Sequence, residues 1–226
     1  MTFSTFLRHS TVVLGLFLTI IAPCYAQITS TFTDTRDGKT YRTVKIGNLT
    51  WMAENLYYVD NGWQCHHCEE DPCSWGTCSR CYRSSADSCA KYGRLYNWNA
   101  AMAACPPGWS VPTREEWGDL VVAVGGRIAA DSTGLGGKWE NAGVKLKSKT
   151  EWDGTDDFGF SALPGGYRHA NGDFGSVGSY GYWWTVVEGG NGAYIRGMGS
   201  GVENVGEGTN GKTNGNSVRC LQDMRQ

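Results

Sequence analysis

Residues 89–117 read CAKYGRLYNWNAAMAACPPGWSVPTREEW, and this segment is the most informative about the fold. Within it, a short helix is expected over 97–104, because three apolar side chains would share one of its faces: Trp98, Ala101 and Met102. The Pro-Pro-Gly turn at 106–108 ends this helix, since proline cannot continue helical hydrogen bonding.

A second helix is predicted to begin directly after that turn. Thr113 and Glu116 have the spacing of a capping box, in which each side chain accepts a hydrogen bond from the other residue's backbone amide. Four apolar residues then recur at helical spacing, namely Trp117, Leu120, Val121 and Val124. The glycine pair at 125–126 marks the end of this helix.

Strands are predicted on both sides of these helices. Thr40–Ile46 alternates polar and apolar residues, 47–48 is a two-residue hairpin turn, and 49–53 forms the returning strand. Further short strands are expected at 144–147, 159–163, 182–187, 193–198 and 217–221. Long loops are expected at 168–180 and 199–216.

The composition favours a compact, loop-rich fold over a helical bundle. The 32 glycines indicate many turns, and the 10 tryptophans and 11 tyrosines indicate that a few large rings fill the core. Core positions are expected for Trp51, Trp98, Trp109, Trp117 and Trp183. A formal net charge of −2 without a basic patch argues against nucleic acid as a partner.

The N-terminus resembles a secretory signal over residues 1–26. Arg8 and His9 precede an uncharged apolar run at 11–22, and small residues precede Gln27. The run is too short to span a bilayer, and no later segment is apolar for long enough to do so. We therefore expect a secreted or cell-surface protein. A buried N-terminal helix and a lipid anchor at Cys24 are the alternatives.

The chain contains nine cysteines, and removal of the signal would leave an even number, which indicates disulfides in an exported chain. A bridge between Cys105 and Cys220 would tie the last strand to the middle of the chain. The other six crowd into 65–89: Cys65, Cys68, Cys73, Cys78, Cys81 and Cys89. Two C-x-x-C pairs within that group also fit a structural zinc site. Disulfides are favoured because the compartment is oxidising.

Five segments together resemble the Fibrobacter succinogenes major paralogous domain family: 40–55, 92–117, 155–168, 181–185 and 217–223. The resemblance covers 34–223 and implies an α+β, C-type-lectin-like fold, which formylglycine-generating enzymes share. In that fold two helices pack on a twisted antiparallel sheet with long glycine-rich loops. The resemblance also implies the bridges Cys105–Cys220 and Cys81–Cys89. The cysteine-rich insert at 57–89 departs from the family through its four additional cysteines.

Three motifs could carry chemistry, and each has a simpler interpretation. Residues 206–213 fit a phosphate-binding loop, but no helix has room to follow, so a glycine loop is favoured. Asp153, Asp156 and Asp157 could hold calcium, but aspartates that cap turn amides are favoured. His66, His67 and His169 lack the spacing of a metal-binding helix pair and are expected on loops. We therefore expect no cofactor.

The sequence favours a non-enzymatic binding or adhesion domain whose ligand is a polysaccharide or a surface protein. Aromatic rings beside polar side chains hold sugars, because the ring covers the apolar sugar face. Trp63 and Trp75 are loop aromatics of this kind, and the candidate contacts are Phe174, Tyr180, Tyr194, Arg196 and Asn204. The alternatives are an enzyme of the formylglycine-generating type, for which Cys220 alone is present near the C-terminus, and a structural envelope protein.

Overall fold

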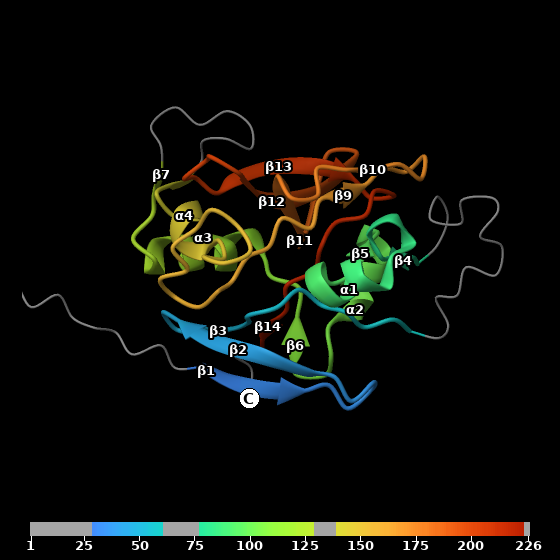
Figure 1. Cartoon of the computed structure of the whole chain (residues 1–226), viewed down its shortest axis with the longest axis horizontal. Helices are drawn as coiled ribbons and strands as arrows, with labels where there is room; N and C mark the ends of the chain where they lie inside the picture. Colours follow the sequence, from blue (N-terminus) through green and yellow to red (C-terminus); the bar gives the residue numbers. More distant parts are fainter. Residues whose placement is uncertain (1–28, 61–76, 129–138, 224–226) are drawn as a thin grey trace, which may run out of the picture.

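The computed structural model describes residues 29–60, 77–128 and 139–223. Within these ranges the chain is a mixed α/β structure with mostly antiparallel sheets. Figure 1 shows β1 to β3 at the bottom of the view and β11 to β13 at the top, with short helices between them on both sides. The predicted signal at 1–26 lies outside the described residues, as do these members of the insert: Trp63, Cys65, His66, His67, Cys68, Cys73 and Trp75.

The larger sheet has the strand order β1-β2-β3-β14-β6. Its members are β1 (Thr29–Thr33), β2 (Thr40–Ile46), β3 (Leu49–Met52), β14 (Leu221–Gln222) and β6 (Trp109–Ser110). The predicted hairpin is confirmed, because β2 has the expected bounds and Val44 pairs with Trp51. Gly47 adopts a φ of +60° in the turn, a conformation that glycine reaches without steric cost. Because this sheet contains both β1 and β14, the first and last strands of the described residues lie in the same sheet.

The smaller sheet contains β11 (Tyr180–Gly189), β12 (Gly192–Gly199) and β13 (Gly206–Gly211) in that order. The central part of β11 is buried on both faces: Trp183 packs against Trp117 at 6.1 Å, and the Trp184 indole donates to the carbonyl of Tyr96. The predictions at 182–187 and 193–198 are confirmed. The prediction of a loop over 199–216 is wrong at 206–211, where the chain forms strand β13. This edge strand was missed because its glycines interrupt the alternation of apolar and polar residues that marks a strand.

Both predicted helices are present, as α2 (Trp98–Ala104) and α3 (Arg114–Ala123). The capping box of α3 is confirmed with both of its hydrogen bonds. The described residues also contain η3 (Tyr82–Ser84), α1 (Ala86–Tyr92) and α4 (Gly143–Leu146). The strand predicted at 144–147 is wrong because α4 is there, and a single helical turn is too short to show periodicity. No helix of the described ranges has the length and apolar character needed to cross a bilayer.

Three short strand pairs fasten loops to the body of the molecule. They are β4 (Ser79–Arg80) with β5 (Leu95–Tyr96), β7 (Arg127–Ile128) with β8 (Trp139–Glu140), and β9 (Tyr167–Arg168) with β10 (Phe174–Gly175). Two predicted strands are reduced to bridges. In the segment 159–163, only Ala162 pairs with another residue, Lys147. In the segment 217–221, Ser217 forms a bridge with Trp183, and Leu221 begins β14.

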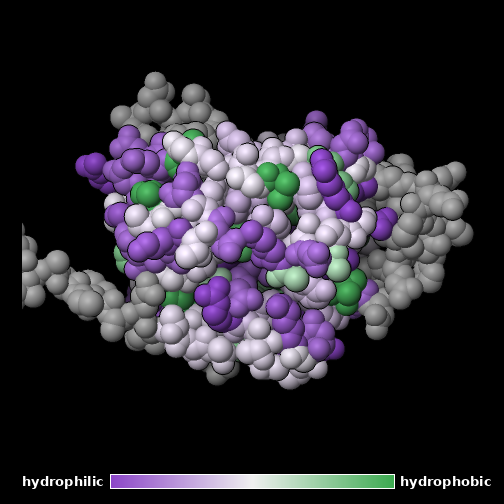
Figure 2. Space-filling model, in the orientation of Figure 1, coloured by the Kyte–Doolittle hydropathy of each residue, from purple (hydrophilic) through white to green (hydrophobic). Residues whose placement is uncertain are grey.

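The core consists of two apolar clusters, one of which is built on tryptophan. Trp51 lies 5.1 Å from Trp117 and 5.6 Å from Phe160, ring centre to ring centre. Four of the five tryptophans predicted for the core are buried. The fifth, Trp98, is half-buried and packs against the second cluster. In Figure 2 the visible face carries only small, separate hydrophobic areas. The rings thus fill the interior and leave little apolar surface on this face.

A buried arginine joins three segments at the centre of the molecule. The Arg219 guanidinium donates to the amide oxygen of Asn55 at 2.8 Å and to the carbonyl of Phe160 at 2.5 Å. The Trp183 indole donates to the same oxygen of Asn55 at 2.8 Å. Burial lowers the pKa of the Arg219 guanidinium to about 9. These hydrogen bonds offset the desolvation of the charge.

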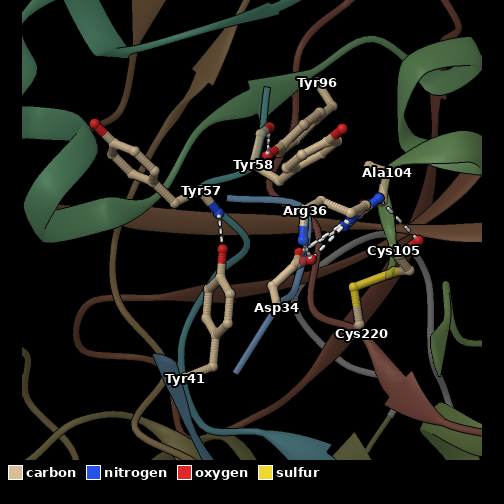
Figure 3. The surroundings of a disulfide bond; sticks show 9 residues. All are labelled: Asp34, Arg36, Tyr41, Tyr57, Tyr58, Tyr96, Ala104, Cys105 and Cys220. Carbon is tan, nitrogen blue, oxygen red and sulfur yellow. Dashed lines mark hydrogen bonds and ion pairs between the residues drawn. A yellow bond between two sulfur atoms is a disulfide. The ribbon is translucent and has the colours of Figure 1, made fainter. Parts of the chain in front are cut away.

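Both disulfides implied by the family resemblance are confirmed. Cys105 is bonded to Cys220 with a Cα–Cα distance of 5.9 Å, and Cys81 is bonded to Cys89. Figure 3 shows Arg36 beside the Cys105–Cys220 disulfide, where its guanidinium donates hydrogen bonds to the backbone oxygens of Ala104 and Cys105. The N-terminal turn is thereby attached to the end of α2.

Cys78 is also disulfide-bonded, and its partner lies outside the described residues. Cys78 and Cys81 form the second C-x-x-C pair of the sequence, and both sulfurs are therefore in disulfides. Zinc binding requires free thiolates, so the pairing favours the disulfide interpretation of these two residues.

Candidate functional site

The two segments predicted as long loops, 168–180 and 199–216, meet at one cavity of about 280 Å³ on the β11–β12–β13 sheet, where the second segment contributes strand β13. His169 and Ser176 line it from 168–180, and Thr209 and Asn210 line it from 199–216. The remaining lining residues are Tyr167, Tyr182 and Ile195. Loops that are far apart in sequence therefore contribute to a single surface.

A row of aromatic side chains runs along this surface. The Tyr180 and Tyr182 rings are parallel within 4°, with their centres 5.9 Å apart. Tyr182 meets Tyr167 edge-on at 5.6 Å, and Tyr167 meets His169 in the same way at 4.7 Å. The Tyr167 hydroxyl lies 2.9 Å from Nε2 of His169. We call Tyr167, His169, Tyr180 and Tyr182 the tyrosine face.

The strand period and two glycines place these rings. Tyr180 and Tyr182 are two residues apart on β11 and so point to the same face of the sheet. Their partners on β12 are Gly199 and Gly197. A Cβ atom at Gly199 would lie 2.6 Å from the Tyr180 ring, which shows that the ring rests on the glycine backbone. Glycine therefore provides the space in which the first ring lies.

Asparagine side chains hold the two loops together beside the tyrosine face. The Asn214 amide oxygen accepts the backbone N–H of Ala170 at 2.8 Å. The Asn214 amide nitrogen donates to Asn210, and Asn210 donates to Asn216 at 3.3 Å. Because Asn210 also lines the cavity, its amide is fixed by its neighbours before any ligand arrives.

The cavity is lined by neutral polar groups and apolar carbon, with the single imidazole of His169. Burial, together with the neighbouring Tyr180 and Tyr167, raises the pKa of the Tyr182 hydroxyl. The hydroxyl is therefore protonated at neutral pH and can both donate and accept hydrogen bonds. Such a lining suits an uncharged ligand that presents hydroxyl groups.

Tyr180 is the one predicted contact residue in the tyrosine face. The Phe174 ring packs on Tyr82 at 5.2 Å, beside the site and not in it. Tyr194 lies on the other face of β12, where the Arg114 guanidinium covers its ring at 3.9 Å.

The last two predicted contacts, Arg196 and Asn204, lie outside the tyrosine face. Arg196 is 1% exposed and forms an ion pair with Glu207, so it cannot reach a surface ligand. Asn204 is half-buried in the turn before β13, where its backbone carbonyl packs against Gly143. Nothing in the local sequence indicates that Arg196 is buried against Glu207 of β13.

Three members of the tyrosine face were not among the predicted contacts: Tyr167, His169 and Tyr182. The spacing Tyr180-Gly181-Tyr182 at the start of β11 is a usable signal, because alternate strand residues share a face. Tyr167 and His169 join them through β9, which has only two residues and no recognisable pattern.

Two larger cavities, of about 470 and 500 Å³, lie where the β1–β3 hairpins face the 148–163 segment. Both include Arg42 and Asp156. Both of these shared residues already have partners: Arg42 pairs with Glu54 at 3.2 Å, and the Asp156 carboxylate accepts the amide and hydroxyl of Ser161. Size alone therefore does not identify the binding site.

The other candidate motifs have structural roles in the described residues. Asp156 accepts the Ser161 amide and Asp153 accepts the Gly201 amide, as expected for aspartates that cap turns. Within the described ranges, no group of three or more His, Cys, Asp or Glu side chains is placed to hold a metal ion. The phosphate-loop pattern at 206–213 is strand β13 and the turn after it, so it lacks the helix that a phosphate site requires.

Comparison with known proteins identifies a family but no characterised relative. No curated protein and no solved structure matches the chain. The family model described as the Fibrobacter succinogenes major domain matches residues 44–222, which run from within β2 to the end of β14 and include the tyrosine face. This protein therefore belongs to the Fibrobacter succinogenes major domain family.

Proposed function

We propose that this protein is an exported, non-enzymatic binding domain of C-type-lectin-like fold whose tyrosine face binds an uncharged polysaccharide. The observation that carries the proposal is the meeting of the 168–180 segment and strand β13 at a cavity lined by tyrosine rings and uncharged polar side chains, with one imidazole. The sequence favoured a polysaccharide or a surface protein, and a lining without a carboxylate, lysine or arginine side chain favours the first.

The chemistry of sugars matches that of the tyrosine face. A pyranose ring has an apolar face that packs on an aromatic ring and hydroxyl groups that need hydrogen-bond partners. Tyr180 supplies an exposed ring, and Asn210 supplies a fixed amide in the cavity. The cavity is slightly smaller than the roughly 300 to 1,000 Å³ typical of small-molecule sites. It would therefore hold part of a longer chain, with the remainder lying along the rings.

Export is supported by the disulfides. Cys81–Cys89 and Cys105–Cys220 are formed, and Cys78 is bonded as well. Disulfides persist in oxidising compartments and are rare in the cytosol. A rigid, cross-linked scaffold that carries a tyrosine-lined cavity at its loops is a suitable arrangement for a cell-surface binding domain.

The proposal is tested by co-sedimentation of the purified protein with insoluble plant and bacterial polysaccharides. We expect binding to at least one neutral polysaccharide, and weakening of about tenfold in Tyr180→Ala and Tyr182→Ala, which corresponds to about 1.4 kcal/mol. Val122→Ala is the matched control, because Val122 is 64% exposed on α3, away from the tyrosine face. Absence of binding across a broad panel would refute the proposal. Binding that both tyrosine variants retain would place the site elsewhere.

A further inference from the structure

Lys147 carries a buried charge that the proposed binding chemistry does not use. It follows α4, and its side chain is 2% exposed. The ammonium donates to the carbonyl oxygens of Gly199 and Val202, each at 3.0 Å, and lies 2.7 Å from the Asp153 carboxylate. Lysine is almost never buried to this extent unless its charge is paired.

A second layer of contacts closes the same turn around the ammonium. The other oxygen of Asp153 accepts the Gly201 amide. The Trp152 indole donates to the Ser200 hydroxyl at 2.9 Å, and its ring centre lies 5.4 Å from the ammonium. Every residue from 199 to 202 is therefore bonded either to Lys147 or to a side chain beside it.

The ammonium is surrounded by two carbonyl oxygens and a carboxylate oxygen, which are the ligands that proteins use to bind hard metal cations. We propose that the Lys147 ammonium is a built-in cation that holds the 199–202 turn in place of a bound metal ion. Unlike a metal, the cation is covalently attached and cannot be lost by chelation. It connects the end of α4 to a turn that lies 52 residues later in the chain.

The turn that Lys147 holds adjoins the tyrosine face. Gly199 pairs with Tyr180 in the sheet, and the Tyr180 ring rests on it. The Ser200 amide donates to the carbonyl of Ser179, the residue before Tyr180. Lys147 is therefore a positioning residue for the exposed end of the tyrosine face. This consequence rests on the proposed polysaccharide binding, whereas the role of the ammonium in the turn does not.

The first experiment measures deuterium exchange in a peptide that covers 199–204. In Lys147→Met we expect exchange there to rise by about tenfold or more, because hydrogen bonds to a charged group are lost. Lys145→Met is the matched control: Lys145 is in α4, but its ammonium caps the carbonyl of Val124 at 2.8 Å. Unchanged exchange in Lys147→Met, or an equal rise in Lys145→Met, would overturn the proposal.

A rescue experiment separates the role of the cation from simple loss of packing. Methylammonium added to Lys147→Ala should slow the exchange of 199–204 again, whereas tetramethylammonium at equal concentration should not, because it has no N–H donors. Failure of methylammonium to slow the exchange would count against a built-in cation. If Lys147→Ala does not fold, Asp153→Asn provides the same readout, since it removes the carboxylate from a side chain that is 40% exposed.

The consequence for binding is measured with whichever polysaccharide the wild-type protein sediments with. We expect Lys147→Met to weaken that binding about tenfold while Lys145→Met retains it. Loosening of the turn with unchanged binding would refute the positioning role. If the wild-type protein binds no polysaccharide, the proposed function fails, and the exchange and rescue measurements still decide whether Lys147 holds the turn.

Discussion

Cys105, the residue after α2, is bonded to Cys220, the residue before β14, across 115 positions of sequence. The bond joins the end of α2 to the five-stranded sheet that contains β14. Arg36 reaches the same place, because its guanidinium is ion-paired with Asp34 and donates to the Ala104 carbonyl at 2.8 Å. The start, middle and end of the domain are therefore fastened at one point.

Loss of this bond should lower stability more than loss of the shorter one. In the chain-entropy model, closing a loop of 115 residues contributes about 5 kcal/mol, and closing one of 8 residues contributes about 2.5 kcal/mol. We expect this order for the free energies of unfolding of Cys105→Ser/Cys220→Ser and Cys81→Ser/Cys89→Ser in denaturant titrations without reductant. Equal losses would show that strain or packing, and not loop length, determines the contribution.

Replacement of Arg219 should destabilise the fold without any effect on surface charge pairs. Arg219→Met leaves the Phe160 carbonyl without this donor and leaves the Asn55 amide oxygen with the Trp183 indole as a donor, and the loss of a partner for a buried acceptor costs about 1–3 kcal/mol. We expect a loss of about 3 kcal/mol or more in urea unfolding. Arg42→Met is the control, because its side chain is 60% exposed and such surface pairs contribute about 0–1 kcal/mol. Comparable losses in the two variants would contradict this view of the core.

Asp34 should contribute to an acid-dependent loss of stability. Burial by itself would raise the pKa of its carboxyl, but hydrogen bonds from the Arg36 side chain and amide and the Arg36 charge lower it overall. A carboxyl with a lowered folded pKa stabilises the protein above its unfolded value of about 3.9. That contribution is lost as the pH falls through the lower, folded value.

Asp34→Asn should therefore be less stable than the wild-type protein at pH 7, by about 2 kcal/mol for hydrogen bonds to a charged group. The difference between the two should shrink below about pH 3.9. Denaturant titrations at several pH values between 7 and 2 measure it. A difference that stays constant across this range would show that the Asp34 carboxylate charge is not responsible.

A methyl group at Gly199 should disturb the tyrosine face specifically. The Cβ atom of Gly199→Ala would lie 2.6 Å from the Tyr180 ring, so the ring must move. We expect weaker binding to the polysaccharide found by co-sedimentation, by about tenfold. Retained affinity in this variant would show that Tyr180 does not contact the ligand.

Gly118→Ala is the matched glycine variant for that experiment. Gly118 lies inside α3, and nothing lies within 4 Å of the Cβ atom that alanine would add. We expect unchanged polysaccharide binding and a gain of about 1 kcal/mol in the free energy of unfolding, because alanine is the better helix former. A loss of stability in this variant would contradict the open space described for α3.

The elements predicted correctly from the sequence are those whose signals lie within a few residues. The capping box of Thr113 and Glu116 marks the start of α3, and the alternation in Thr40–Ile46 marks β2. The two disulfides were expected through the family resemblance. By contrast, α4 is too short to show a period, and β13 is an edge strand with glycine at both ends.

The candidate site was predicted only in part, because its residues come from separate strands. Tyr180 was expected at a loop, and the loops 168–180 and 199–216 were expected to carry recognition; both line the cavity. Arg196 was expected there as well, and it is buried against Glu207. The ring order from Tyr180 through Tyr182 to Tyr167 depends on the pairing of β9 and β11 segments that no local pattern encodes.

Local sequence signals specify the helices that carry their own caps, the hairpin that carries its own turn, and most of the large residues that fill the core. Local hydrogen bonds and side-chain periodicity settle these features, and both act between near neighbours. Two other features depend on the tertiary fold: which rings form the tyrosine face, and the position of the Lys147 ammonium beside carbonyls more than fifty residues away. These features arise from burial and pairing between distant segments. Such contacts depend on how the whole chain packs, so no single segment of the sequence can predict them.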